Sequence, residues 1–137
     1  MLKGASAETV RLLLERQGKA AGPDPILALK DAVGSARAAF AEPGALGRTV
    51  HHRMGDMPGS QLLAFWIADV VVHSWDLAAA IGVNPGLDEQ LVEFVYGHCA
   101  LIAQRGALYA NGWFAVPARP LPEGAAPLER LVNLVGR

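Results

Sequence analysis

The sequence predicts an all-α fold with three long helices, short helical pieces at both ends and a small irregular or β appendage. Three observations support this class. Apolar residues recur at helical spacing over most of the 137 residues, clusters of Gly and Pro separate these segments, and only short stretches favour extended backbone. Neither a repeat nor a low-complexity segment interrupts the pattern, so residues 1–137 are expected to form a single domain.

Two helices are predicted in the first part of the chain. The apolar side of residues 6–18 predicts a short helix. Asp24 followed by Pro25 is typical of a helix start, because proline is tolerated at the first helical position. The apolar side chains that follow recur at helical spacing and predict a long helix over residues 24–41.

The appendage is expected within residues 47–59, between the second helix and the third. Thr49 and Val50 are β-branched and favour extended backbone, whereas Gly55 and Pro58 favour a turn. This pattern predicts a short strand or hairpin and no large sheet.

Two long helices and a short one are predicted in the second half. Ser60 is expected to cap a central helix over residues 60–82, and a third long helix follows over residues 87–105. Residues 113–116 lie in a stretch rich in Gly and Pro and are expected to pair briefly as a strand. Pro127 is expected to begin the last short helix.

Composition and charge exclude several classes of function. The net charge is −1 and the isoelectric point about 6.4, without the clusters of Lys and Arg that nucleic acids or anionic membranes attract. Cys99 is the single cysteine, so an intrachain disulfide is impossible, and the N-terminus lacks an apolar signal core. A cytoplasmic protein without nucleic-acid or membrane partners is expected. Charged residues make up only 18%, which indicates a surface covered by a second subunit and hence a homodimer.

The central helix carries the candidate site. Asp69, His73 and Asp76 interrupt an apolar run at positions i, i+4 and i+7, which places them on one stripe of a helix. These three polar residues argue against a membrane span. An acid and a His one turn apart can ligate the same metal ion. The alternative, a buried acid–imidazole pair that orients two helices, stays open at this point.

Three further residues are assigned to this site as candidates. Asp76 is expected either to accept a hydrogen bond from the second imidazole nitrogen of His73 or to make a hydrogen bond at a helix end or between helices. His51 and His52 precede the central helix and are candidate substitute ligands. The alternative for both is a pair of solvated loop histidines.

Other reactive or aromatic residues are expected to be structural. His98 lies on an apolar stripe and is interpreted as a core histidine with satisfied hydrogen bonds. Cys99 has no neighbour that would lower its pKa and is expected to be inert. Trp66 and Trp75 are expected in the core. No nucleophile elbow, phosphate-binding loop or dinucleotide fingerprint occurs, so no residue is assigned a catalytic role.

The stretch DVVVHSWDLAAAIG resembles the mycothiol-dependent maleylpyruvate isomerase-like family, which belongs to the DinB-like metal-binding four-helix bundles. The resemblance extends to PGALGRTV and to the ending PLERLVNLVGR. It implies a divalent metal, usually zinc, held by three side chains, two of which map onto Asp69 and His73. It also implies mycothiol, a low-molecular-weight thiol, as cosubstrate. The thiolate adds to a double bond of the acceptor, rotation follows, and the thiolate is eliminated.

The chain departs from this family at the third ligand, a His on an earlier helix. No His occurs before His51, so the resemblance implies a truncated DinB-like bundle. The expected function is that of a metal-binding protein of the thiol-dependent isomerase or transferase kind, weakened or inactive alone. The alternative is a non-catalytic helical association module with a structural Asp–His pair. Three long helices leave the central helix partly uncovered, so a homodimer is expected in which a partner's His reaches Asp69 and His73.

Overall fold

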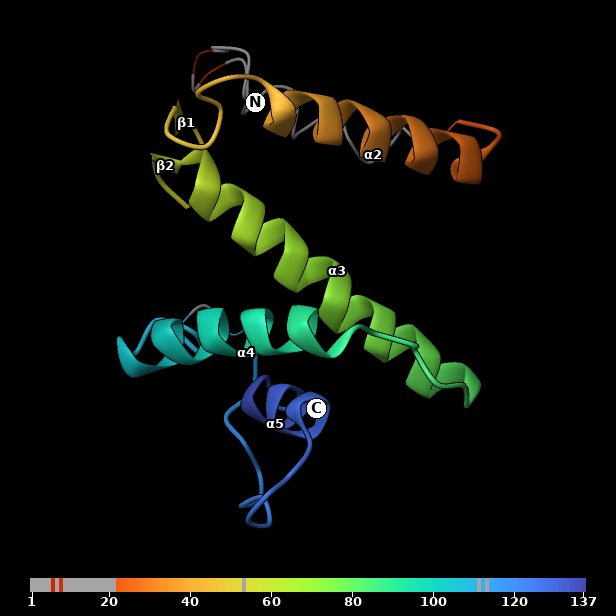
Figure 1. Cartoon of the computed structure of the whole chain (residues 1–137), viewed down its shortest axis with the longest axis vertical. Coiled ribbons are helices and arrows are strands. Elements are labelled where there is room, and N and C mark those ends of the chain that lie inside the picture. Colours follow the sequence, from red (N-terminus) through yellow and green to blue (C-terminus); the bar gives the residue numbers. More distant parts are fainter. Residues whose placement is uncertain (1–5, 7, 9–21, 53, 111, 113) are drawn as a thin grey trace. The chain divides into compact units, whose positions relative to one another are not determined.

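A computed structural model of the chain describes residues 6, 8, 22–52, 54–110, 112 and 114–137. Within them lie α2 (Pro25–Ala41), β1 (Thr49–Val50), β2 (Met57–Pro58), α3 (Gly59–Ile81), α4 (Glu89–Gln104) and α5 (Pro127–Leu134) (Figure 1). The predicted all-α class with a small β appendage is therefore confirmed, and so are its three long helices. The helix expected over residues 6–18 falls almost entirely outside the described residues.

Backbone contacts divide the chain into two compact units, Met1–Leu63 and Ala64–Arg137. The first unit contains α2, both strands and the first turn of α3. The second contains the rest of α3 together with α4 and α5. Each unit is described by itself below, and the single domain expected over residues 1–137 stays a prediction.

Helix α2 begins as the sequence predicts. The carboxylate of Asp24 accepts hydrogen bonds from the backbone N–H groups of Ile26 at 3.1 Å and Leu27 at 2.9 Å. Pro25 occupies the first helical position, where its missing N–H costs nothing. The start of α2 is thus fixed by a side-chain cap and a proline.

The appendage is a two-stranded antiparallel sheet. Thr49 lies opposite Pro58, and Val50 lies opposite Met57. Val50 and Met57 are buried, whereas Thr49 and Pro58 are exposed. The alternation expected of a half-buried strand therefore holds over this short pair, and the predicted hairpin is confirmed.

The first N–H groups of helix α3 donate to backbone carbonyls of the preceding turn. The N–H of Gly59 donates to the carbonyl of Arg48 at 2.9 Å, and the N–H of Ser60 donates to the carbonyl of Leu46 at 2.8 Å. Backbone carbonyls of the preceding turn thus satisfy donors that a cap would otherwise bind. The expected cap at Ser60 is wrong, because the helix already begins at Gly59.

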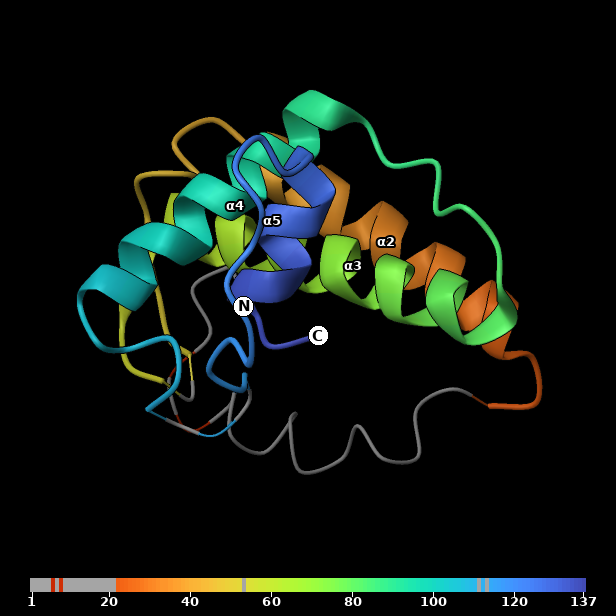
Figure 2. The ribbon, with the colours of Figure 1, turned by 90° about the horizontal axis from the view of Figure 1, so that it is seen from below.

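The second unit is built on a core shared by three helices. Figure 1 shows α3 crossing α4, and in both views α5 lies beside α4 (Figure 2). Helices α3 and α4 contribute small or β-branched side chains, α5 contributes Leu131, and Leu108 and Val135 come from the turns that follow α4 and α5. The buried set is Ala68, Val71, Val72, Val92, Val95, Cys99, Leu108, Leu131 and Val135.

Local signals set the ends of these helices. Gly82 adopts a positive φ of 70° at the end of α3, and the extended connection after it, drawn in green in Figure 2, leads to α4. The carboxylate of Asp88 caps α4 by accepting from the N–H of Leu91 at 2.9 Å. Pro127 begins α5 as predicted. The strand expected over residues 113–116 is wrong, because residues 114–116 form none.

The chain turns sharply after α5, which places Arg137. Gly136 has a φ of +72°, and the N–H of Arg137 donates to the carbonyl of Val132 at 2.9 Å. A Cβ on Gly136 would lie only 2.7 Å from the carbonyl carbon and the Cβ of Ala115. Only glycine therefore fits here, for both the conformation and the space.

Gly136→Ala should consequently destabilise the second unit. We expect a loss of about 2–3 kcal/mol, from a left-handed alanine and from overpacking against Ala115, measured by urea unfolding. Gly124→Ala is the matched control, since Gly124 also has a positive φ of 79° but has open space around its Cβ position. Its expected loss is about 1 kcal/mol. Equal losses in the two variants would contradict the close approach to Ala115.

Candidate functional site

The polar stripe of α3 brings Asp69, His73 and Asp76 together as the sequence predicts. The Nδ1 atom of His73 lies 3.2 Å from Oδ2 of Asp76. The Nε2 atom of the same ring lies 3.5 Å from Oδ1 of Asp69. Each carboxylate thus faces a different nitrogen of one imidazole, and only Asp76 is within good hydrogen-bond distance of the ring.

Arg137 completes this cluster from the segment after α5. Its Nε donates to Oδ1 of Asp76 at 2.7 Å, and its Nη2 donates to Oδ2 at 3.2 Å. The guanidinium also lies 6.0 Å from the centre of the Phe114 ring. A two-point contact of this kind fixes the plane of the carboxylate, so Arg137 orients Asp76, and Asp76 in turn orients His73.

Arg137 is the member of the cluster to which the sequence alone does not point. The sequence offers only an indirect indication, because a carboxylate on an apolar helix is expected to pair with a positively charged side chain. The chain has 12 Lys and Arg residues, and nothing in their spacing selects one of them. The contact spans 61 positions of sequence and depends on how α5 packs.

Charge and hydrogen bonding shift the acid–base behaviour of this pair. Hydrogen bonds from Arg137 lower the pKa of Asp76 most strongly, and the positive charge of Arg137 and the bond to His73 lower it further. Burial opposes the shift. The same contact raises the pKa of Arg137. Asp76 is therefore ionised even at pH values well below neutral. Its carboxylate can accept a hydrogen bond from an N–H group on Nδ1 of His73.

The cluster is more exposed than expected from its apolar neighbours. The side chains of Asp69 and His73 are 74% and 64% exposed, whereas that of Asp76 is 30% exposed. The alternative of a buried acid–imidazole pair therefore does not hold. A pair this exposed loses little hydration on folding, and it contributes little to holding two helices in a fixed orientation.

The spacing of the donor atoms fits a metal ion. Zinc binds His nitrogen and carboxylate oxygen at about 2.0–2.2 Å in a tetrahedral arrangement, so two of its ligand atoms lie about 3.3–3.6 Å apart. The observed 3.5 Å between Nε2 of His73 and Oδ1 of Asp69 agrees with that separation and is too long for a good hydrogen bond. Within the described part of the chain, however, no group of three or more His, Cys, Asp or Glu side chains could hold a metal.

His51 and His52 belong to the first unit and have local contacts there. The Nδ1 atom of His51 lies 2.7 Å from Oδ1 of Asp56. The Nδ1 atom of His52 accepts a hydrogen bond from the N–H of Met54 at 3.3 Å. Their proposed role as substitute ligands stays a prediction.

The remaining candidates divide between the core and the surface. Cys99 is buried, and burial raises its pKa to about 11, so the thiol is inert as expected. His98 packs its ring edge-on against Phe65 at 5.4 Å. Its buried Nε2 finds no hydrogen-bond partner among the described residues, and burial lowers its pKa, which corrects the expected satisfied histidine. Trp66 is 41% exposed, so its expected place in the core is wrong.

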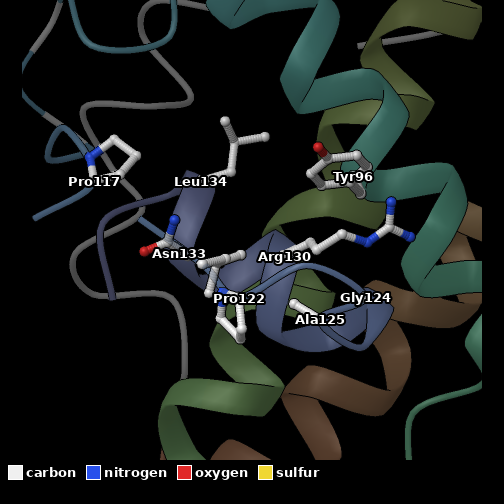
Figure 3. A pocket seen from close by; sticks show the side chains of 9 residues that line it. Tyr96, Pro117, Pro122, Gly124, Ala125, Arg130, Asn133 and Leu134 are labelled. Atoms are coloured by element: carbon white, nitrogen blue, oxygen red, sulfur yellow. The ribbon is translucent and has the colours of Figure 1, made fainter. Parts of the chain in front are cut away.

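An open pocket of about 460 Å³ lies elsewhere on the second unit, between α4, α5 and the loop before α5 (Figure 3). The guanidinium of Arg130 lies 4.7 Å from the centre of the Tyr96 ring and pairs with Glu93. The lining is otherwise mostly Pro, Ala, Gly and Leu. Because Glu93 already neutralises the cation, the pocket presents no free charge to a ligand.

Among the described residues, α3 is the one helix long and apolar enough to cross a membrane by length and composition. Only 28% of its most apolar window is buried. Length and composition of this kind also suit an apolar helix of a soluble protein. Asp69, His73 and Asp76 in the middle of the run would be costly in lipid.

Comparison with known proteins gives two relatives and no family. No family model matches the chain, and no solved structure matches it. Two uncharacterized proteins of Mycobacterium tuberculosis, from strains CDC 1551 / Oshkosh and ATCC 25618 / H37Rv, are each 32% identical to it over 119 residues. The match takes in 85% of this chain and 64% of each relative. The chain thus spans a little under two thirds of the length of these relatives.

Arg137→Gln tests the contact with Asp76 through its pH dependence. Because the folded-state pKa of Asp76 is lowered from 3.8, the stability that the pair contributes is present above that value and is lost as the pH falls through the lower folded value. We expect the variant to be less stable by about 1 kcal/mol near neutral pH, as for a partly exposed ion pair. The difference should shrink towards zero in strong acid, as followed by urea unfolding.

Arg119→Gln is the control for this experiment, since Arg119 is exposed on the loop before α5. Its stability should match that of the unsubstituted chain throughout the pH range. A loss in Arg137→Gln that does not change with pH would contradict the assignment to Asp76.

Proposed function

We propose that this chain binds a divalent cation of the zinc kind through His73 and Asp69. One observation carries the proposal: Nε2 of His73 and Oδ1 of Asp69 are separated by 3.5 Å, the spacing of two ligands on one tetrahedral ion. Exposure supports it as well, because an ion can reach both donors from solvent.

The neighbours of His73 favour the same role. A metal-ligating His usually donates its second ring N–H to a carboxylate, which fixes the ring and raises its basicity. Asp76 stands in that position on Nδ1, and Arg137 holds Asp76 in place. With Nδ1 facing Asp76, the Nε2 atom of His73 is the one that would face the ion.

The proposed reaction class is that of a thiol-dependent isomerase or transferase, as the resemblance to the maleylpyruvate isomerase-like family implies. A bound divalent ion would favour the thiolate form of a thiol brought beside it. The thiol would come from a small molecule such as mycothiol. Cys99, the single cysteine of the chain, is buried with its pKa raised to about 11 and cannot serve as that nucleophile.

A second candidate function is that of a non-catalytic helical association module. The exposed apolar side chains on α3 favour it, since Val70, Leu77 and Ile81 are each more than 60% exposed. Apolar side chains gathered on one helix face are typical of association sites. We place either function in the cytoplasm, because a single cysteine suits a reducing compartment.

His73→Ala should abolish zinc binding, because the variant lacks the imidazole that is the stronger of the two ligands. Zinc content is measured on the purified protein by elemental analysis, and affinity by competition with a chromogenic chelator. Asp76→Ala should keep the ligand but weaken binding by about 10–100-fold, as the loss of an orienting partner does. Glu123→Ala is the control, since Glu123 is exposed on the loop before α5, and this variant should retain zinc. Stoichiometric zinc in His73→Ala would contradict the assignment.

Isomerase activity, measured as cis–trans conversion of maleylpyruvate, should require added mycothiol and should be lost in Asp69→Ala, because the metal then has one ligand fewer. Cys99→Ala should keep the activity, since the internal thiol takes no part. Conversion without added thiol, or at full rate in Asp69→Ala, would exclude this mechanism while leaving metal binding to be judged by the zinc content.

A further inference from the structure

His98 joins α4 to α3 beside the core of the second unit. Its ring meets the ring of Phe65 on α3 edge-on, with 5.4 Å between the ring centres and 68° between the ring planes. The next residue, Cys99, is 2% exposed and packs in the core with side chains of α3 and α5. The contact between the two rings therefore lies at the crossing of α3 and α4, next to a buried thiol.

The Nε2 atom of His98 is buried and lacks a hydrogen-bond partner among the residues that the structure describes. An unpaired nitrogen of a neutral imidazole already loses its hydration on folding. An imidazolium in the same place loses more, because both nitrogens then carry N–H groups and the ring carries a full charge. The closed crossing therefore favours the neutral ring.

The charges of the neighbouring helices do not compensate a proton on His98. By helical spacing, Asp69 on α3 lies on the same side as the ring that His98 contacts, and Arg105 after α4 lies on the same side as His98 itself. Glu93 lies on another side of α4 and pairs with Arg130 of α5. None of these groups acts on the pKa of His98, which burial alone lowers.

We propose that the crossing of α3 and α4 is a pH-sensitive contact, in which a proton on His98 separates the two helices locally and exposes the thiol of Cys99. The imidazolium leaves the contact because water solvates its charge and both of its N–H groups, whereas the aromatic and aliphatic side chains of the crossing do not. This device is separate from the proposed metal-binding function and needs no bound ion.

The crossing is a contact of modest size, so one side chain can change its stability. Helices α3 and α4 meet where they cross and diverge on either side of that point (Figure 1). The side chains that pack there are small or β-branched, and each of them buries little apolar area. They are Ala68, Val71, Val72, Val92 and Val95.

Acid should open the crossing over a defined range of pH. In the open state His98 has its ordinary pKa of 6.5, whereas burial lowers the pKa in the closed state. Below pH 6.5 the open state therefore binds more protons than the closed state. The closed state loses stability as the pH falls from this value to the lower pKa of the buried ring. Because one proton is involved, the open population rises by at most about tenfold per pH unit.

Cys99 reports the opening, because it is the single cysteine of the chain. The full chain is treated with 4,4′-dithiodipyridine, which forms a mixed disulfide with accessible thiols, from about pH 7.5 to about pH 5, the range in which histidine titrates. Each rate is divided by the rate of the same chain in concentrated urea at the same pH, where the thiol is fully accessible. This ratio removes the pH dependence of the reagent. We expect the ratio to rise as the pH falls below 6.5.

Two variants remove the proton without removing the side chain. His98→Phe keeps an aromatic ring against Phe65, and His98→Gln serves as a second variant because the Phe ring is larger than the imidazole. Both side chains stay neutral, so the labelling ratio should not change with pH in either variant. His51→Phe is the matched control, since His51 belongs to the first unit and contacts Asp56 there. Its ratio should rise in acid as in the unsubstituted chain.

The urea dependence of labelling separates a local opening from unfolding of the whole unit. Two helices that part expose less surface than an unfolded unit, so the labelling rate in acid should depend less steeply on urea than global unfolding does. Equal steepness would overturn the local opening. A ratio that does not change with pH, or that rises equally in His98→Phe and His98→Gln, would overturn the role of His98.

Discussion

The structure depends on the fact that α3 is apolar on two opposite faces while α4 and α5 cover only one of them. Ala68, Val71 and Val72 are drawn into the core of the second unit, which fixes the rotation of the helix about its axis. The same rotation turns Val70, Leu77 and Ile81 outward. A polar pair on that outer face is reached by solvent ions but is supported by few neighbours, so a site there needs additional groups to hold it.

Part of that support comes from the end of α5. A glycine-dependent turn at Gly136 places Arg137 against Asp76, and Asp76 holds the imidazole of His73 by Nδ1. Each contact restricts the conformations of the next side chain, and the guanidinium is half-buried. Most of the conformational entropy of these side chains is therefore lost on folding, before a ligand binds. The imidazole is thereby oriented before any ligand arrives, which favours binding.

Most elements of the fold were predictable, because their signals are local. Asp24 with Pro25, Gly82 and Pro127 mark helix ends through backbone rules that hold in any context. The start of α3 was not predictable, because backbone carbonyls of the preceding turn bind its first N–H groups in place of a Ser60 cap. The pairing of Asp69, His73 and Asp76 follows from helical spacing. Their exposure does not, since an apolar run has no intrinsic buried side. Arg137 joins through a tertiary contact that spacing cannot reveal.

The central claim, that His73 and Asp69 ligate a divalent metal, is tested most directly by X-ray absorption at the zinc edge of the zinc-loaded protein. We expect a first shell of nitrogen and oxygen at about 2.0–2.2 Å, with the outer-shell scattering that imidazole produces. That scattering should disappear in His73→Ala. A sulfur shell at about 2.3 Å, or a spectrum of hydrated zinc without imidazole, would contradict the claim.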